Sequence, residues 1–314
     1  MENYLFFIII VLVVLAVIDL MVGVSNDAVN FLNSALGSKA ISFKTVMIVA
    51  SLGILCGAVF SSGMMEIARS GIFVPAQFSF MDVMVIFLAV MVTDVILLDL
   101  FNYFGLPTST TVSIVFELLG AAVSLAIYKI VSIDASWSTL PDYINTEKAS
   151  GIVVSILLSV AISFSVGMLV QYISRLLFTF QFDKKIRTVG VFFGGIAMSA
   201  IAYFILIKGL KEVTFMPADL KAWIATHELM LLGGSFIFFT LLSFILTRLQ
   251  VNILKVIIIV GTFALALSFA GNDLVNFIGV PVAAYLSIGI FEQVAGADPN
   301  SYMMAALASD DMVA

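Results

Sequence analysis

Long apolar segments separated by short polar segments make up most of this chain. Runs with few or no charged residues, each long enough to span a bilayer, occupy residues 5–24, 45–65, 83–104, 110–128, 151–174, 188–207, 229–247, 256–272 and 274–291. A helix needs about 20 apolar residues to cross the roughly 30 Å of hydrocarbon in a membrane. The pattern therefore predicts nine hydrophobic helices in an all-α polytopic membrane protein.

The first apolar segment is predicted to be a retained helix. It follows Glu2 in place of the basic residues of a signal peptide, and it runs past Asp19 without a cleavage site of small residues. The composition agrees with a membrane protein, since 62% of the residues are hydrophobic, 11% are charged and the mean hydropathy is +1.19. These values exclude an ordinary soluble domain.

Basic residues cluster in alternate loops between the apolar segments. The richer loops hold Lys39, Lys44, Arg175, Lys184, Lys185, Arg187, Arg248 and Lys255. Because cytoplasmic loops carry more Lys and Arg, these loops are predicted to be cytoplasmic and the N-terminus to lie outside, in a cell inner membrane. No basic block suggests a nucleic-acid partner. The single cysteine, Cys56, excludes a disulfide within the chain.

One internal repeat stands out. The segment VSNDAVNF at 24–31 aligns with AGNDLVNF at 270–277, with five of eight positions identical, and each copy is expected to end a long apolar helix. Each copy places two Asn residues four apart, on one helical face. Paired polar interruptions in corresponding apolar segments are typical of a transporter built from two repeats, with its binding site between them. Because acids at membrane depth are costly, Asp27 and Asp273 are interpreted as functional.

A second unusual feature breaks the apolar stretch at 94–122. Gly105 and Pro107 precede the run Thr108, Ser109, Thr110 and Thr111. Such a break frees backbone groups that lipid cannot satisfy, so we expect them to line protein or a water-filled cavity. Thr108 is predicted to cap the following helix, whose first turn would then form a natural anion site.

With both features located, the chain resembles the inorganic phosphate transporter (PiT) family, of the sodium/phosphate symporter type. That family has a duplicated signature near G-A-N-D-V-A-N and a P-V-S-T-T-H motif, which is read here at 107–112. The resemblance continues through 35–62 and 276–287. Ser25 replaces the usual small Ala and Val112 replaces the His of the motif, so any role of that His is absent here.

The resemblance implies a site made from both repeats and the hydroxyl turn. For phosphate it implies Asp27, Ser109, Thr110, Thr111 and Asp273. For the cation, with Na⁺ as the bound metal, it implies Asn26, Asn30, Asn272, Asn276 and Thr108. No cofactor is expected beyond Na⁺ as the coupling ion.

The predicted organisation is an inverted-repeat transporter with broken or re-entrant helices. Residues 1–130 are read as the first repeat, 131–250 as connecting transmembrane helices, and 251–314 as the start of the second repeat. The spacing from Asp27 to Ser109, applied from Asp273, would place a second hydroxyl turn beyond Ala314. We therefore expect the second repeat to be incomplete and the chain to be truncated at its C-terminus.

The predicted function is secondary active uptake of inorganic phosphate coupled to a cation gradient, with Na⁺ favoured. An H⁺-coupled phosphate or sulfate permease of the same fold is the alternative, because buried acids also carry protons. Other classes are a passive channel and an intramembrane aspartyl-type enzyme, although no protease motif accompanies a catalytic pair. The expected partners are phosphate, Na⁺ or H⁺ and the lipid bilayer, and a homodimer remains open. Five further acids in or near the apolar segments are candidates either for function or for a position near an interface or a pairing within the bundle: Asp19, Glu66, Asp94, Asp99 and Glu117.

Overall fold

The computed structural model describes residues 2–60, 71–134, 136–180, 182–205, 217–294 and 296–308. The nine apolar segments fall in nine long helices: α1 (Glu2–Ser38), α2 (Phe43–Phe60), α3 (Phe80–Phe104), α4 (Thr110–Ser132), α6 (Thr146–Phe178), α7 (Phe182–Tyr203), α9 (Glu228–Arg248), α10 (Ile253–Asn272) and α11 (Leu274–Glu292). Short helices α5 (Leu140–Tyr143) and α8 (Ala218–Thr226) lie between them.

The predicted all-α membrane protein is confirmed in its architecture. The described part of the chain has 7 stretches of helix long and apolar enough to cross a membrane. This number is lower than nine because α10 and α11 count as one stretch and α2 is shorter than the rest. Glu66 and the ends of the predicted segments 45–65 and 188–207 lie outside the described residues.

The chain forms two compact units, each assembled from separated segments. The first contains Met1–Val29, Met64–Leu157 and Asp273–Ala314, and the second contains Asn30–Gly63 and Leu158–Asn272. These two units group residues that pack together, whereas the predicted boundaries at 130 and 250 were placed from the sequence repeats. The division into two repeats stays a prediction.

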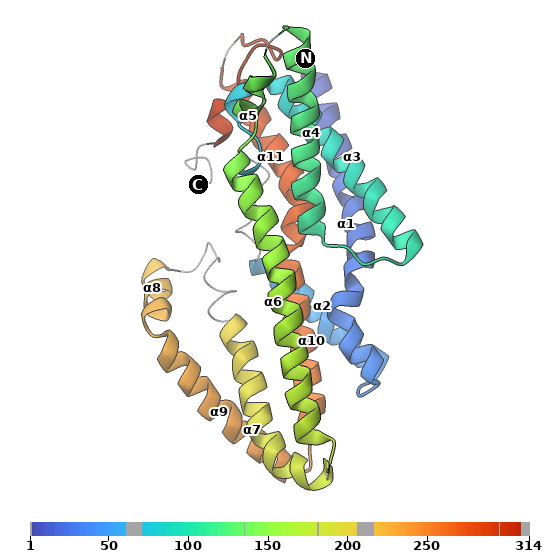
Figure 1. The fold of residues 1–314 in the computed structure, drawn as a ribbon, viewed down its shortest axis with the longest axis vertical. Helices are drawn as coiled ribbons and strands as arrows, with labels where there is room; N and C mark the ends of the chain where they lie inside the picture. Colours follow the sequence, from blue (N-terminus) through green and yellow to red (C-terminus); the bar gives the residue numbers. More distant parts are fainter. Residues whose placement is uncertain are drawn as a thin grey trace. The chain divides into compact units, whose positions relative to one another are not determined.

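In the first unit, α3 and α4 form an antiparallel hairpin that packs against α11 (Figure 1). Their common core includes apolar residues from the first half of α1. Ser79 begins α3 with a capping box, in which its hydroxyl accepts from the Asp82 amide and the Asp82 carboxylate accepts from the Ser79 amide. Lys129, near the end of α4, donates to Asp82 at 2.7 Å and joins the two helices at their far ends. The hairpin is therefore fixed at the end opposite its connecting turn.

The two copies of the repeat differ in backbone structure. The second copy contains a one-residue interruption, because α10 ends at Asn272 and α11 begins at Leu274, while Asp273 between them keeps a helical conformation with φ of −93° and ψ of −24°. The prediction is wrong for the first copy, since α1 continues through it to Ser38. Gly271 stands where the first copy has Ser25, and glycine costs a helix about 1 kcal/mol relative to alanine, so this difference contributes only a small part of the contrast.

Within the first unit, α1 and α11 also approach closely at the repeats. Gly23 precedes the first copy and Phe277 ends the second. A Cβ atom on Gly23 would overlap the ring of Phe277, which is itself fully buried. Glycine at this position therefore allows α11 to pack directly against the part of α1 that carries Asn26 and Asp27.

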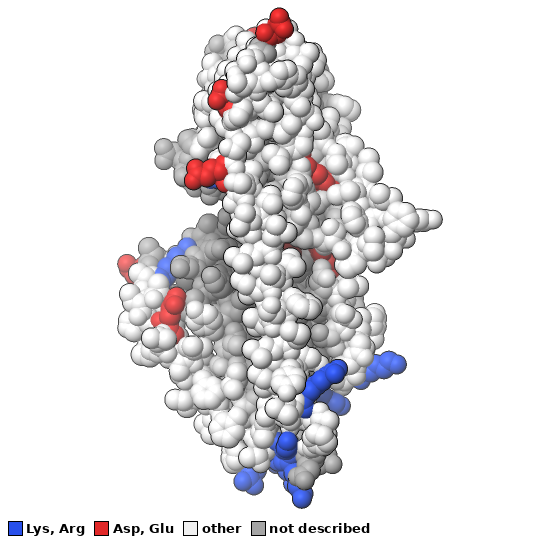
Figure 2. Space-filling view, in the orientation of Figure 1, with Lys and Arg blue, Asp and Glu red and all other residues white. Residues whose placement is uncertain are grey.

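In the second unit, α10 packs against α2 and α7, and α7 packs against α9. Gly53 and Gly57 let α2 approach the backbone of α10, since a Cβ on either would overlap a carbonyl oxygen of that helix. The end of α6, the start of α7, the end of α9 and the start of α10 lie together in Figure 1. Figure 2 shows Lys and Arg gathered at this end.

Candidate functional site

The turn between α3 and α4 forms the centre of the candidate site. Gly105 ends α3 in the left-handed conformation, with φ of 65°, which glycine adopts without steric cost. Ser109 is the N-cap of α4, and its hydroxyl accepts from the Val112 amide at 3.4 Å. The prediction that Thr108 caps this helix is therefore wrong. The cap lies one residue later than Thr108, whose amide donates to Asn26 Oδ1.

Asn26 of α1 holds this turn through three hydrogen bonds. Its Nδ2 donates to Asn102 Oδ1 at 2.9 Å and to the Leu106 carbonyl oxygen at 3.1 Å. Its Oδ1 accepts from the Thr108 amide at 2.8 Å. Asn102 Nδ2 in turn donates to the Val22 carbonyl oxygen at 2.9 Å. Asn26 is 5% exposed, so these bonds satisfy backbone groups that a break within a membrane leaves without partners.

The second copy of the repeat meets the start of α4 at Thr111. Thr111 Oγ1 donates to Asp273 Oδ1 at 3.2 Å and accepts from Asn276 Nδ2 at 2.9 Å. Asn276 Nδ2 also donates to Asp273 Oδ1 at 3.4 Å. The Thr110 side chain, 1% exposed, lies near the same carboxylate. The helix break at Asp273 therefore faces the first turn of α4.

This arrangement combines donors for an anion with oxygen ligands for a cation. The first amides of a helix have no partner within it, and the helix dipole adds partial positive charge there. Ser109 accepts from the amides of Val112 and Ser113 but not from those of Thr110 and Thr111. The two repeats and the turn contain no Lys or Arg. Among these segments, the start of α4 is therefore the feature that offers partial positive charge to an anion.

The structure brings most of the predicted site residues into one unit. Asn26, Asp27, the run 108–111, Asp273 and Asn276 all belong to the first unit, and Asp27 is buried with 3% exposure. Ser109 is exposed. Asn30 is exposed and belongs to the second unit, and the side chain of Asn272 lies outside the described residues. The roles of Asn30 and Asn272 stay predictions.

Sequence reasoning missed Asn102, which links Asn26 to the backbone of α1. A signal was present, since Asn102 is the one amide side chain in the last two turns of α3, directly before Gly105 and Pro107. An amide side chain there can satisfy backbone groups that the nearby break frees. The pairing with Asn26, 76 residues earlier, required the fold.

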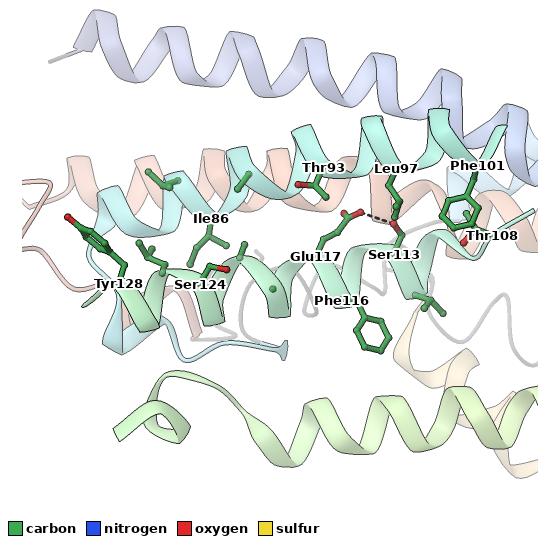
Figure 3. A pocket seen from close by; sticks show the side chains of 16 residues that line it. Ile86, Thr93, Leu97, Phe101, Thr108, Ser113, Phe116, Glu117, Ser124 and Tyr128 are labelled. Carbon is green, nitrogen blue, oxygen red and sulfur yellow. Dashed lines mark hydrogen bonds between the residues drawn. The ribbon is translucent and has the colours of Figure 1, made fainter. Parts of the chain in front are cut away.

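A groove of about 780 Å³ extends along α3 and α4 from the turn (Figure 3). Its walls are mostly apolar, and include Ile86, Leu97 and Phe116. Polar side chains occur along its length, namely Thr93, Thr108, Ser113, Glu117, Ser124 and Tyr128. Figure 3 shows Glu117 and Ser113 pointing toward each other between the two helices.

Comparisons with known proteins identify the family to which the chain belongs. Residues 23–309 match the Phosphate transporter family. The chain belongs to the Phosphate transporter family, whose members are transporters and not enzymes. This membership excludes the alternative of an intramembrane aspartyl-type enzyme.

Individual relatives have low sequence identity to this chain but match most of its length. A Haemophilus influenzae protein named Putative phosphate permease is 25% identical over 276 residues, which are 84% of this chain and 63% of that protein. A Thermococcus kodakarensis protein with a similar name is 26% identical over 287 residues, again 84% of this chain and 63% of the relative. The chain thus spans 63% of the length of these relatives.

The fold is shared with a solved structure, that of the sodium-dependent phosphate transporter. The TM-score is 0.67 and the sequence identity is 20%, over 96% of this chain and 72% of that one. This likeness shows that the helical arrangement described above is that of a known transporter fold.

Proposed function

We propose that this protein takes up inorganic phosphate by secondary active transport coupled to a cation gradient, with Na⁺ as the favoured ion. The observation that carries the proposal is the contact of Thr111, at the start of α4, with Asp273 and Asn276 of the second repeat. The names of the relatives, phosphate permeases, and of the structural match, a sodium-dependent transporter, support the substrate and the ion.

Carboxylates near a phosphate anion are consistent with this substrate. Hydrogenphosphate carries P–OH groups, and a carboxylate such as Asp273 accepts hydrogen bonds from them. Sulfate is fully ionised and has no such donor, so an acid in direct contact selects against it. For phosphate we propose Asp27, Ser109, Thr110, Thr111 and Asp273 as binding residues.

The cation site is proposed on the amide and hydroxyl oxygens next to the phosphate site. Asn side chains and unwound backbone carbonyls are hard oxygen ligands suited to Na⁺. The proposed cation-binding residues remain Asn26, Asn30, Asn272, Asn276 and Thr108. A bound cation then offsets the charge of phosphate in a site without Lys or Arg.

We also propose that the basic ends of α6, α7, α9 and α10 face the cytoplasm, with the N-terminus outside. The gathering of Lys and Arg at one end of the second unit supports this orientation (Figure 2). The two repeats are proposed to be inverted relative to each other in a cell inner membrane.

Removal of Na⁺ tests the coupling ion directly. The purified protein in proteoliposomes, with pH and membrane potential held fixed, would receive labelled phosphate with an inward Na⁺ gradient or with choline in its place. We expect uptake to rise at least about tenfold with Na⁺, since each tenfold ion gradient contributes about 1.4 kcal/mol per ion moved. Uptake that ignores Na⁺ but collapses with the proton gradient would contradict the assignment.

A further inference from the structure

Three acidic side chains from three different helices meet within the first unit. Asp19 of α1 and Asp94 of α3 are both 0% exposed, and the half-buried Glu117 of α4 lies beside them. Ser113, one turn before Glu117, lies between Asp94 and Glu117. None of these four residues, here called the acidic cluster, belongs to the phosphate or cation set proposed above.

The geometry around Ser113 requires a proton on one of its acidic partners. Ser113 Oγ lies 2.8 Å from Asp94 Oδ1 and 2.8 Å from Glu117 Oε1. A hydroxyl has one hydrogen, so Ser113 donates to one carboxyl group and can only accept from the other. The carboxyl group from which it accepts must carry a proton. Two ionised carboxylates would leave one of these contacts as a repulsion between lone pairs.

Asp19 gives a second, independent indication. Both of its carboxyl oxygens are buried and find no hydrogen-bond donor among the described residues, although the side chain faces Asp94. An ionised carboxylate without a donor is very costly in a low-dielectric interior. A neutral, protonated Asp19 avoids this cost.

The helices around the acidic cluster supply no basic side chain that could neutralise it. The sequences of α1, α3 and α11 contain no Lys, Arg or His, and the one basic residue of α4, Lys129, is bound to Asp82. The acids of α11 and its N-cap lie elsewhere, with Asp273 bound to Thr111 and Glu292 at the end of the helix. In the described part of the chain, no three acidic, His or Cys side chains are arranged so that they could hold a metal ion. The protonated carboxyl group that the two Ser113 contacts require is therefore the positive species that this geometry supports.

One edge of the cluster reaches a groove that also extends to the proposed phosphate site. Ser113 and Glu117 line the groove along α3 and α4, and Thr108 of the turn lines it too (Figure 3). Ser113 and Thr111 occupy the first turns of the same helix, so the cluster and the contact with Asp273 share one rigid element. A change of charge at Glu117 therefore acts on the helix that presents Thr111.

We propose that the acidic cluster of Asp19, Asp94, Glu117 and Ser113 is a proton-binding site, separate from the phosphate and Na⁺ site, that loads and releases a proton during transport. The proton comes from water in the groove and adds to a carboxylate oxygen, and its release to water restores the carboxylate, with no change at Ser113. The part of this inference that concerns transport rests on the proposed function, whereas proton binding itself does not.

Infrared spectroscopy of the purified protein tests proton binding without any transport assay. A protonated carboxyl group has a C=O stretch that an ionised carboxylate lacks, and this band shifts in D₂O. We expect the band at neutral pH in the wild type, and its reduction in both Glu117→Gln and Asp19→Asn. Asp99→Asn is the matched control, because Asp99 is an exposed acid of α3 outside the cluster.

The absence of the band at neutral pH, or its equal loss in Asp99→Asn, would overturn the proposal. Loss of the band when Na⁺ replaces choline at constant pH would also overturn it, because the cluster would then bind Na⁺ in place of a proton. Two variants at different helices keep the result interpretable if one of them fails to fold. None of these outcomes depends on whether phosphate is the substrate.

A measurement of phosphate uptake tests whether the cluster binds and releases its proton during transport. Phosphate changes its own charge near neutral pH, so the measured quantity is the ratio of variant to wild-type uptake at each pH, in which phosphate speciation cancels. For Glu117→Gln we expect this ratio to change at least about threefold between about pH 6 and pH 8. A constant ratio, as expected for Asp99→Asn, would show that the cluster takes no part in transport.

Discussion

Asp273→Asn is expected to reduce the rate of phosphate uptake at least about 100-fold, which corresponds to about 2.7 kcal/mol. Asp273 Oδ1 accepts from Thr111 and from Asn276 at the helix break, and the proposed function adds a P–OH donor. The amide keeps the size of the side chain but loses the charge, and its nitrogen cannot accept. Charge-assisted hydrogen bonds are worth about twice as much as neutral ones, so the loss exceeds that of a simple polar change.

The control for this variant is Asp99→Asn, the same change at an exposed position. We expect its uptake to stay within about twofold of the wild type, since exposed substitutions away from a site have small effects. Thermal unfolding in detergent would show that both variants are folded. Retention of more than about a tenth of the wild-type rate by folded Asp273→Asn would contradict a central role for this carboxylate.

Asn26→Ala and Asn102→Ala are expected to be equally harmful, each lowering phosphate uptake about tenfold or more, and not to add in the double variant. Both act through the same structure, because Asn26 bonds Asn102, Leu106 and Thr108 while Asn102 bonds α1. Loss of either leaves buried polar groups of the break unsatisfied, at about 1–3 kcal/mol for each group. Residues of one network show coupling energies of about 0.5–3 kcal/mol in a double-mutant cycle.

The measurement is the full cycle of wild type, two single variants and the double variant, each as a function of phosphate and of Na⁺ concentration. We expect weaker phosphate affinity in all three variants, because the turn that presents the start of α4 is displaced. Ser132→Ala, at the far end of α4, is the control. Wild-type behaviour of Asn102→Ala beside an impaired Asn26→Ala would contradict this prediction, because Asn26 would then act without the network that it shares with Asn102.

The apolar pattern was sufficient to predict the helices because segment length and lack of charge are local properties. The break at 105–109 was also predictable, since Gly105 and Pro107 stand together beside a run of hydroxyl residues, a combination that favours a turn. The continuity of α1 through the first repeat was not predictable from the motif. Both copies contain Asn-Asp, and the difference between Ser25 and Gly271 is small compared with the packing of α11 on Gly23.

The sequence predicted which types of residue form the candidate site, but it did not predict the hydrogen bonds between them. The repeats and the hydroxyl run identified Asp273, Asn276 and Thr111 separately, and the fold supplied their contacts. Asn102 and Ser113 were missed because single Asn and Ser residues in membrane helices commonly only join helices. Asp19, Asp94 and Glu117 lie close together because of how α1, α3 and α4 pack. No local sequence pattern predicts that packing.

The central claim, that this protein carries phosphate, is tested most directly by counterflow in proteoliposomes. Vesicles containing the purified protein and a high internal concentration of unlabelled phosphate would receive external labelled phosphate. We expect labelled phosphate to accumulate transiently in vesicles that contain unlabelled phosphate. Vesicles that contain sulfate at the same concentration should show no such accumulation. A protein that showed the same label entry with phosphate, sulfate or no anion inside would contradict the claim, because a channel or an inactive protein has no exchange to accelerate.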